Sequence, residues 1–158
     1  MDSNNWLKKE IWKKNNSELS NKSESPEEER NEPEPVESHS NQIEIEKILA
    51  GIEKRTTVVL KNISKRNKIP DVVYLLRQKG VGNYDIIYIP LKKKSKKNFG
   101  FAFINFTEPK YIINFYKSFH LQYNEQIGKY FKTFFCHIQG FQKIRDHFDA
   151  KYLYVVTN

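Results

Sequence analysis

Apolar positions follow two different periods after residue 55, and this predicts alternating strands and helices. Short runs rich in β-branched and aromatic residues are typical of strands. Proline at the first turn, followed by apolar residues three and four apart, is typical of helices, and this pattern begins at Pro70 and at Pro109. The runs that predict strands are Thr57–Asn62, Tyr84–Pro90, Phe99–Phe106 and roughly Tyr130–Cys136.

The order of these elements predicts the fold class. It is β-α-β-β-α-β, the order of an α+β ferredoxin-like fold. That fold has a four-stranded antiparallel sheet with two helices on one face. A further short helix is predicted at 141–148, because Phe141, Ile144 and Phe148 recur at helical spacing.

The chain divides into a folded domain and flanking segments. We expect the domain at 55–140, and a C-terminal helix and tail at 141–158. Residues 43–54 predict a short lead-in helix that leans on the domain through an apolar stripe. We expect residues 1–42 to be a disordered acidic tail, because they offer little apolar surface to bury. The apolar stripe consists of Ile45, Ile48, Leu49 and Ile52.

Three aromatic side chains are predicted on one face of the third strand. Side chains alternate between the two faces of a strand, so Phe99, Phe101, Phe103 and Asn105 point one way, and Ile104 and Phe106 point toward the helices. Exposed aromatic rings on a sheet need a partner. Nucleic-acid bases are such a partner, since stacking on a ring contributes about 1–3 kcal/mol per base.

A lysine-rich loop is predicted between the second and third strands. Lys92, Lys93, Lys94, Lys96 and Lys97 fall within six residues, beside the aromatic face. Such a loop can neutralise several phosphates and so gives affinity without sequence specificity. The alternatives are a solvated loop or a nuclear-import signal.

Charge supports a polyanionic partner. The formal net charge is +8, and it is unevenly placed: residues 1–54 hold 8 Lys and Arg against 13 Asp and Glu, whereas residues 55–158 hold 19 against 6. A basic domain of this kind favours nucleic acid. Solubility alone is the other interpretation of the excess.

The sequence has no residue pattern that is typical of a catalytic site or a metal site. Cys136 is the only cysteine, and its neighbour His137 points to the opposite face of a strand. No Cys/His spacing suits zinc, and no glycine-rich phosphate loop is present. We therefore expect no enzyme activity, no cofactor and no metal. No apolar run is long enough to cross a membrane, and no secretion signal is recognisable, so we expect a nuclear or cytoplasmic protein.

Several ordered sequence blocks resemble the carboxy-terminal RNA-recognition motif of Mei2-like proteins. The block at 99–106 matches the RNP1 pattern of RNA-recognition motifs except at its first position, where Phe99 replaces Lys or Arg. The block at 58–63 matches RNP2 in outline, with Val59 where an aromatic residue is usual, and the resemblance implies that this family favours a non-aromatic residue there. The remaining blocks are 46–51, 55–57, 84–90, 109–113 and 138–140.

The resemblance implies a regulator of meiosis or differentiation that binds single-stranded RNA on an open sheet face. The alternative is a protein-interaction module whose sheet is covered, for example by the helix at 141–148, or which binds a peptide. A protein partner could contact Trp6 and Trp12, in a tryptophan- and lysine-containing motif at 6–14, or a helix face. The predicted RNA-contacting residues are Phe99, Phe101, Phe103, Asn105, Val59, Lys61, Tyr88, Lys92, Lys93, Lys94, Lys96 and Lys97.

Overall fold

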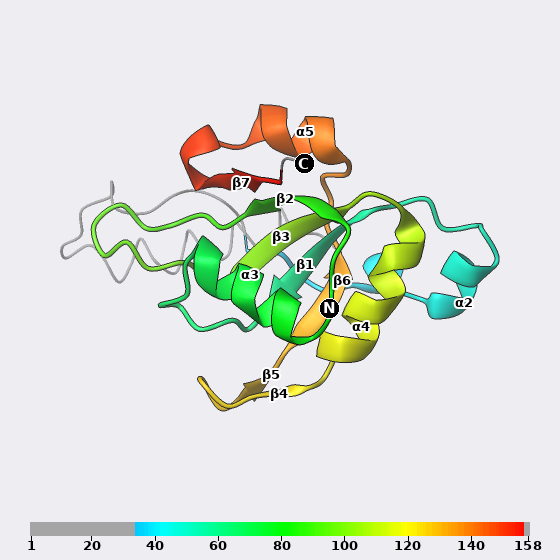
Figure 1. The fold of residues 1–158 in the computed structure, drawn as a ribbon, viewed down its shortest axis with the longest axis horizontal. Coiled ribbons are helices and arrows are strands. Elements are labelled where there is room, and N and C mark those ends of the chain that lie inside the picture. The colour runs from blue at the N-terminus through cyan, green and yellow to red at the C-terminus, as the bar shows by residue number, and fades with distance from the viewer. Residues whose placement is uncertain (1–33, 157–158) are drawn as a thin grey trace.

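The computed structural model describes residues 34–156, in which one antiparallel sheet carries helices on both faces (Figure 1). The strand order is β6-β1-β3-β2-β7, and every neighbouring pair is antiparallel. The strands are β1 (Thr57–Lys61), β2 (Tyr84–Tyr88), β3 (Phe101–Phe106), β6 (Lys132–Phe135) and β7 (Leu153–Val155).

Two helices cover one face of this sheet, as predicted. They are α3 (Ile69–Gln78) and α4 (Ile112–Phe119), the latter preceded by the short 3-10 helix η4 (Pro109–Tyr111). Alternation along the strands sends Val58, Ile104 and Phe106 into the core beneath them. The faces assigned to the third strand from its sequence are therefore confirmed.

A third helix lies on the opposite face of the sheet. It is α5 (Phe141–His147), which Figure 1 shows across the sheet from α3 and α4. Its Ile144 is 1% exposed and belongs to a second apolar cluster with Val59 and Phe134. The sheet is thus a central layer between two apolar cores.

The sheet has one strand more than the four predicted. After α5 the chain passes through the 3-10 helix η5 (Ala150–Tyr152), and β7 then pairs with β2. The register places Leu153 opposite Tyr88 and Val155 opposite Ile86. Three residues of strand are too short a run to be distinguished from a tail by periodicity.

A two-stranded hairpin precedes β6. Its strands are β4 (Tyr123–Asn124) and β5 (Lys129–Tyr130), and they form a separate small sheet. The fourth strand predicted from about Tyr130 thus contains the end of this hairpin and β6. In Figure 1 the hairpin projects from the lower edge of the domain.

The N-terminal part of the described chain packs on the domain. Residues 34–42, predicted to be disordered, include the 3-10 helix η3 (His39–Asn41), and Ser38 is buried. The predicted lead-in helix is present as α2 (Ile45–Leu49), but only part of its predicted apolar stripe packs against the domain. Ile48 is buried, whereas Leu49 and Ile52 are exposed. The tryptophan- and lysine-containing motif at 6–14 and the tail up to residue 33 lie outside the described residues.

No helix within residues 34–156 is both long and apolar enough to cross a membrane.

Candidate RNA-contacting surface

The aromatic face of the sheet is covered, so the predicted open face is wrong. Phe101, Phe103 and Tyr88 are 2%, 1% and 0% exposed. Phe148, at the end of α5, stacks on Tyr88 with 3.8 Å between ring centroids, and its ring lies 5.6 Å from that of Phe103. The rings expected to bind bases bind α5 instead, because apolar side chains at 141, 144 and 148 satisfy the same need for burial.

The start of α5 is fastened to β1 by one side chain. The Gln139 amide oxygen accepts hydrogen bonds from the backbone N–H groups of Thr56 and Thr57, both at 2.9 Å. Its amide nitrogen donates to the carbonyls of Thr57 and Cys136, both at 2.8 Å. Four bonds from one partly buried amide fix the point at which the chain turns onto the sheet face.

Asn105 takes part in the same network. Its side-chain oxygen accepts bonds from the hydroxyls of Thr56 and Thr57 at 2.7 Å, and its amide donates to Asp85 at 2.9 Å. The Thr57 hydroxyl in turn accepts a bond from the backbone N–H of Gly140. Burial raises the pKa of the Asp85 carboxyl, and the bond from Asn105 opposes that rise. Asn105, predicted to contact RNA, therefore supports the turn into α5 indirectly, through Thr57.

Gly140 permits the turn that leads into α5. Its φ is +100°, a backbone conformation that residues with a Cβ atom rarely adopt. The Ile138-Gln139-Gly140 block thus has a local structural purpose, which is to direct α5 over the aromatic face.

The lysine loop is ordered by its own backbone. Leu91 and Asn98 form an isolated bridge at its base, and the N–H of Lys92 donates to the carbonyl of Lys97 at 2.8 Å. The Lys92 ammonium lies 5.5 Å from the centre of the Phe99 ring, which is partly buried. A cation therefore accompanies the position where the RNP1 pattern has a basic residue. The exposed lysines of the loop are Lys93, Lys94, Lys96 and Lys97.

A second basic loop lies against the first. Asn98 is fully buried, and its amide donates to the carbonyls of Ser64 and Asn67 at 2.9 and 2.7 Å. The backbone N–H of Asn98 donates to the carbonyl of Lys65, and the Lys68 ammonium donates to the carbonyl of Lys96. Loops 62–68 and 92–98 are thereby joined at the end of the sheet where β1 finishes and β3 begins. We call this the loop end.

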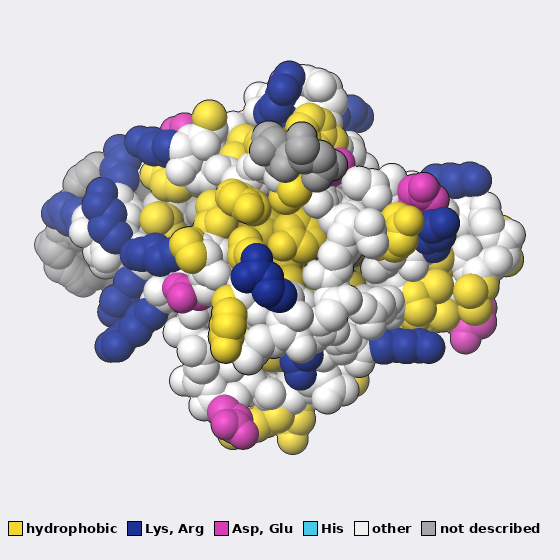
Figure 2. All heavy atoms as spheres, in the orientation of Figure 1, with side chains coloured by type: hydrophobic (Ala, Val, Ile, Leu, Met, Phe, Trp, Pro, Cys, Tyr) yellow, Lys and Arg dark blue, Asp and Glu magenta, His cyan; other side chains and the backbone are white. Residues whose placement is uncertain are grey.

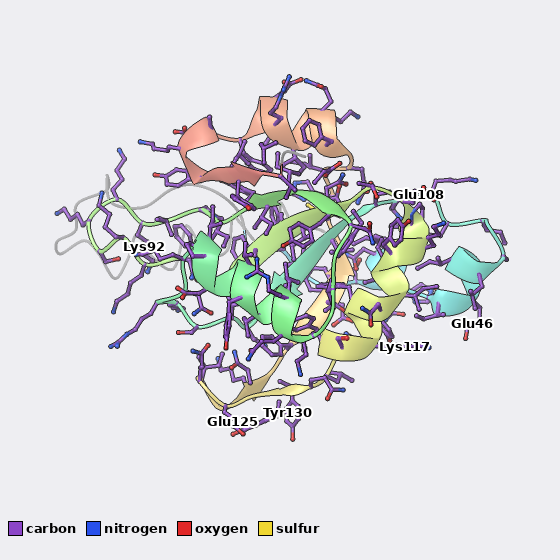
Figure 3. All side chains as sticks on the ribbon, viewed as in Figure 1. Glu46, Lys92, Glu108, Lys117, Glu125 and Tyr130 are labelled. Carbon is purple, nitrogen blue, oxygen red and sulfur yellow. The ribbon has the colours of Figure 1, made fainter. Side chains whose placement is uncertain are left out.

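The joined loops concentrate positive charge. Figure 2 shows dark blue side chains gathered on the left of the view, where Figure 3 labels Lys92. We call this set the basic loop surface, and it consists of Lys65, Arg66, Lys68, Lys92, Lys93, Lys94, Lys96 and Lys97.

The predicted residues therefore separate into three groups. Val59, Tyr88, Phe101, Phe103 and Asn105 are buried beneath α5. Lys61 stays partly exposed on the same face, where it forms a 3.0 Å ion pair with Glu34. Phe99 and the five loop lysines are brought together at the loop end.

Three cations of the basic loop surface escaped the sequence prediction. Lys65, Arg66 and Lys68 fall within 65–68, a shorter and less basic run than the lysine loop, and are not among the predicted RNA-contacting residues. The predicted topology could have identified them. In a β-α-β-β-α-β sheet the loop after the first strand lies at the same end of the sheet as the loop before the third strand.

No group of acidic, histidine or cysteine side chains in the described part of the chain is arranged to hold a metal ion.

Comparison with known proteins shows the family. Residues 55–149 match the model of the family described as RNA recognition motif 2. The chain is 35% identical over 130 residues to the MEI2-like 5 protein of Arabidopsis thaliana, covering 76% of this chain and 16% of that protein. It is also 35% identical over 109 residues to the MEI2-like 5 protein of Oryza sativa subsp. japonica, covering 68% of this chain and 13% of that protein.

Solved structures include more distant matches. One is the Rna15 RNA-recognition motif with bound GU RNA, at 13% identity and a TM-score of 0.48, which covers 58% of this chain and 93% of that one. The assignment rests on the family match over 55–149 and on the order of elements in the described chain. The resemblance to Mei2-like proteins, read first from the sequence blocks, is confirmed. The chain belongs to the RNA recognition motif 2 family, a class of RNA-binding domain.

Proposed function

We propose that this domain binds single-stranded RNA along the loop end of its sheet, while α5 remains on the aromatic face. The observation that carries the proposal is the basic loop surface, which gathers eight cations from two loops that buried Asn98 holds together. The aromatic face contributes little to this binding, because reaching it would require α5 to leave.

The basic loop surface suits a phosphate backbone better than bases. Lysine ammonium groups are flexible point charges, and neutralising phosphates releases counterions regardless of sequence. Phe99 lies beside them as a partly buried aromatic ring, with the Lys92 ammonium over it. We expect affinity that depends steeply on salt, with modest preference among bases.

Titration of a fluorescently labelled oligouridine by anisotropy tests the proposal. The variant replaces Lys93, Lys94, Lys96 and Lys97 by Gln, and affinity at 0.1 M salt should fall at least about tenfold, because roughly 0.7 of a counterion is released per phosphate contact on a single strand. Equal affinity for the wild type and this variant would overturn the proposal. The control replaces four exposed lysines elsewhere and should bind within about threefold of the wild type; its lysines are Lys79, Lys110, Lys117 and Lys143.

A protein-interaction module is the second candidate function. The covered sheet favours it, since the usual base-stacking face is occupied in the isolated domain. A wild-type domain that fails to bind any of a panel of single-stranded homopolymers, while remaining folded, would favour this candidate.

The wider role follows the family resemblance. We propose participation in meiosis or differentiation, in the nucleus or cytoplasm, as a non-enzymatic RNA-binding protein. The chain spans less than a fifth of each of the two MEI2-like 5 relatives, so this role concerns the domain in whatever protein carries it.

A further inference from the structure

Two exposed tyrosines stand together on the β4–β5 hairpin. Tyr123 and Tyr130 are 54% and 57% exposed and face each other across the hairpin register. Their ring centroids are 5.2 Å apart at 66°, an edge-to-face arrangement. Figure 3 shows the Tyr130 side chain directed away from the domain. The two rings stabilise each other's position by this contact, and both still expose aromatic surface to solvent.

The hairpin that carries the pair is held firmly at the loop end. The Asn62 side chain donates to the carbonyl of Tyr130, and the Asn124 side chain donates to the carbonyl of Asn62, both at 2.9 Å. The backbone N–H of Leu121 donates a further bond to the carbonyl of Phe131 at 2.8 Å. Asn62 directly follows β1 and begins the loop that carries Lys65 and Arg66. The hairpin is therefore attached to a loop of the basic loop surface.

Cations continue from that surface toward the tyrosines. Lys61 and Lys132 lie directly opposite each other on neighbouring strands, and Lys132 is exposed. Like charges in this position destabilise a sheet unless an anion lies nearby. Glu34 provides one for Lys61. Lys129 is exposed beside Tyr130, and the one acidic residue of the hairpin, Glu125, lies at its turn.

We infer that Tyr123 and Tyr130 form a base-stacking platform for the same RNA strand that the basic loop surface binds by its phosphates. This inference rests on the proposed function and extends it to the hairpin. Stacking on open rings tolerates any base, and adjacent lysines receive the connecting phosphates. The platform takes the place of the aromatic face that α5 covers.

The test measures binding of oligouridine and oligoadenosine by anisotropy. Replacing both tyrosines by Ala should weaken binding at least about fivefold, because stacking contributes about 1–3 kcal/mol per base. Tyr123→Phe with Tyr130→Phe retains the rings and should bind within about twofold of the wild type. Tyr74→Ala is the matched control: Tyr74 is also 57% exposed but lies on α3, and its loss should leave affinity unchanged.

The possible outcomes separate this inference from the proposed function. If the double Ala variant binds RNA as tightly as the wild type while the lysine-loop variant does not, the platform is wrong and the basic loop surface stands. If the wild type binds neither oligonucleotide, both fail. Circular dichroism must show each variant folded, and if the double Ala variant is not, single Tyr130→Ala replaces it with the same expected direction.

Discussion

At the residue scale, polar side chains decide which surface of this domain is available. Gln139 anchors the start of α5, Asn105 supports that anchor through Thr57, and Asn98 builds the basic loop surface by joining two loops. The sequence indicated correctly which side chains of the third strand share a face. It could not show that Asn105 bonds to Thr56, Thr57 and Asp85, since those bonds depend on register between strands far apart in sequence.

Gln139→Ala should destabilise the domain by at least about 2 kcal/mol, because it removes the acceptor of the Thr56 and Thr57 backbone N–H groups at the start of β1. Gln142→Ala is the control, since Gln142 is exposed on α5 and bonds to Asp146 alone among the described residues. Urea unfolding of both variants gives the comparison. Equal stability of the two would show that the anchor is not needed.

His120 predicts a stability change with pH. Burial lowers its pKa; Lys132 acts in the same direction and Glu37 opposes it. A ring nitrogen accepts a bond from the backbone N–H of Thr133 at 3.2 Å, which the neutral ring alone can do. The unfolded chain binds the proton more tightly, so stability conferred by neutral His120 is present above the ordinary pKa of about 6.5 and is lost as pH falls through the lowered value.

Unfolding free energies at pH 5 to 8 should therefore decrease toward low pH, and His120→Gln should reduce that dependence. Burial also lowers the pKa of His137, which contributes to the slope, so the difference between the wild type and the variant is the quantity to measure. An identical slope in the variant would contradict a role for His120.

At the scale of elements, α5 converts a stacking face into a second core. Periodicity predicted the helix at 141–148, and the structure confirms it at Phe141–His147. The sequence alone does not show which surface this helix covers. Either nucleic-acid bases or an apolar helix can cover exposed aromatic rings, so the aromatic pattern is compatible with both. The strand β7 escaped prediction for a similar reason: its pairing with β2 depends on where α5 delivers the chain.

Phe148→Ala should cost about 3–5 kcal/mol of unfolding free energy, as is usual when a buried aromatic side chain is truncated. Phe148 is 6% exposed and contacts the Tyr88 and Phe103 rings. Chemical denaturation measures the loss. A cost below about 1 kcal/mol would mean that α5 is only loosely attached to the sheet.

At the scale of the whole molecule, the same fold covers the aromatic face of the sheet and exposes the basic loops at one end. The sheet supports α5 on one side and α3 with α4 on the other, and its loop end presents the charge. Composition predicted the basic character, but the contribution of loop 62–68 to it was not predicted. The full basic loop surface depends on the hydrogen bonds from Asn98 that join loops 62–68 and 92–98, and the sequence alone does not indicate these bonds.

The central claim is that RNA occupies the loop end while α5 stays in place, and amide hydrogen exchange with and without a bound single-stranded oligonucleotide tests it most directly. We predict slower exchange at 62–68 and 92–98 on binding, with the protection of 141–147 unchanged. Faster exchange at 141–147 on binding, together with slower exchange in β1 and β3, would show that RNA displaces α5 and would contradict the account.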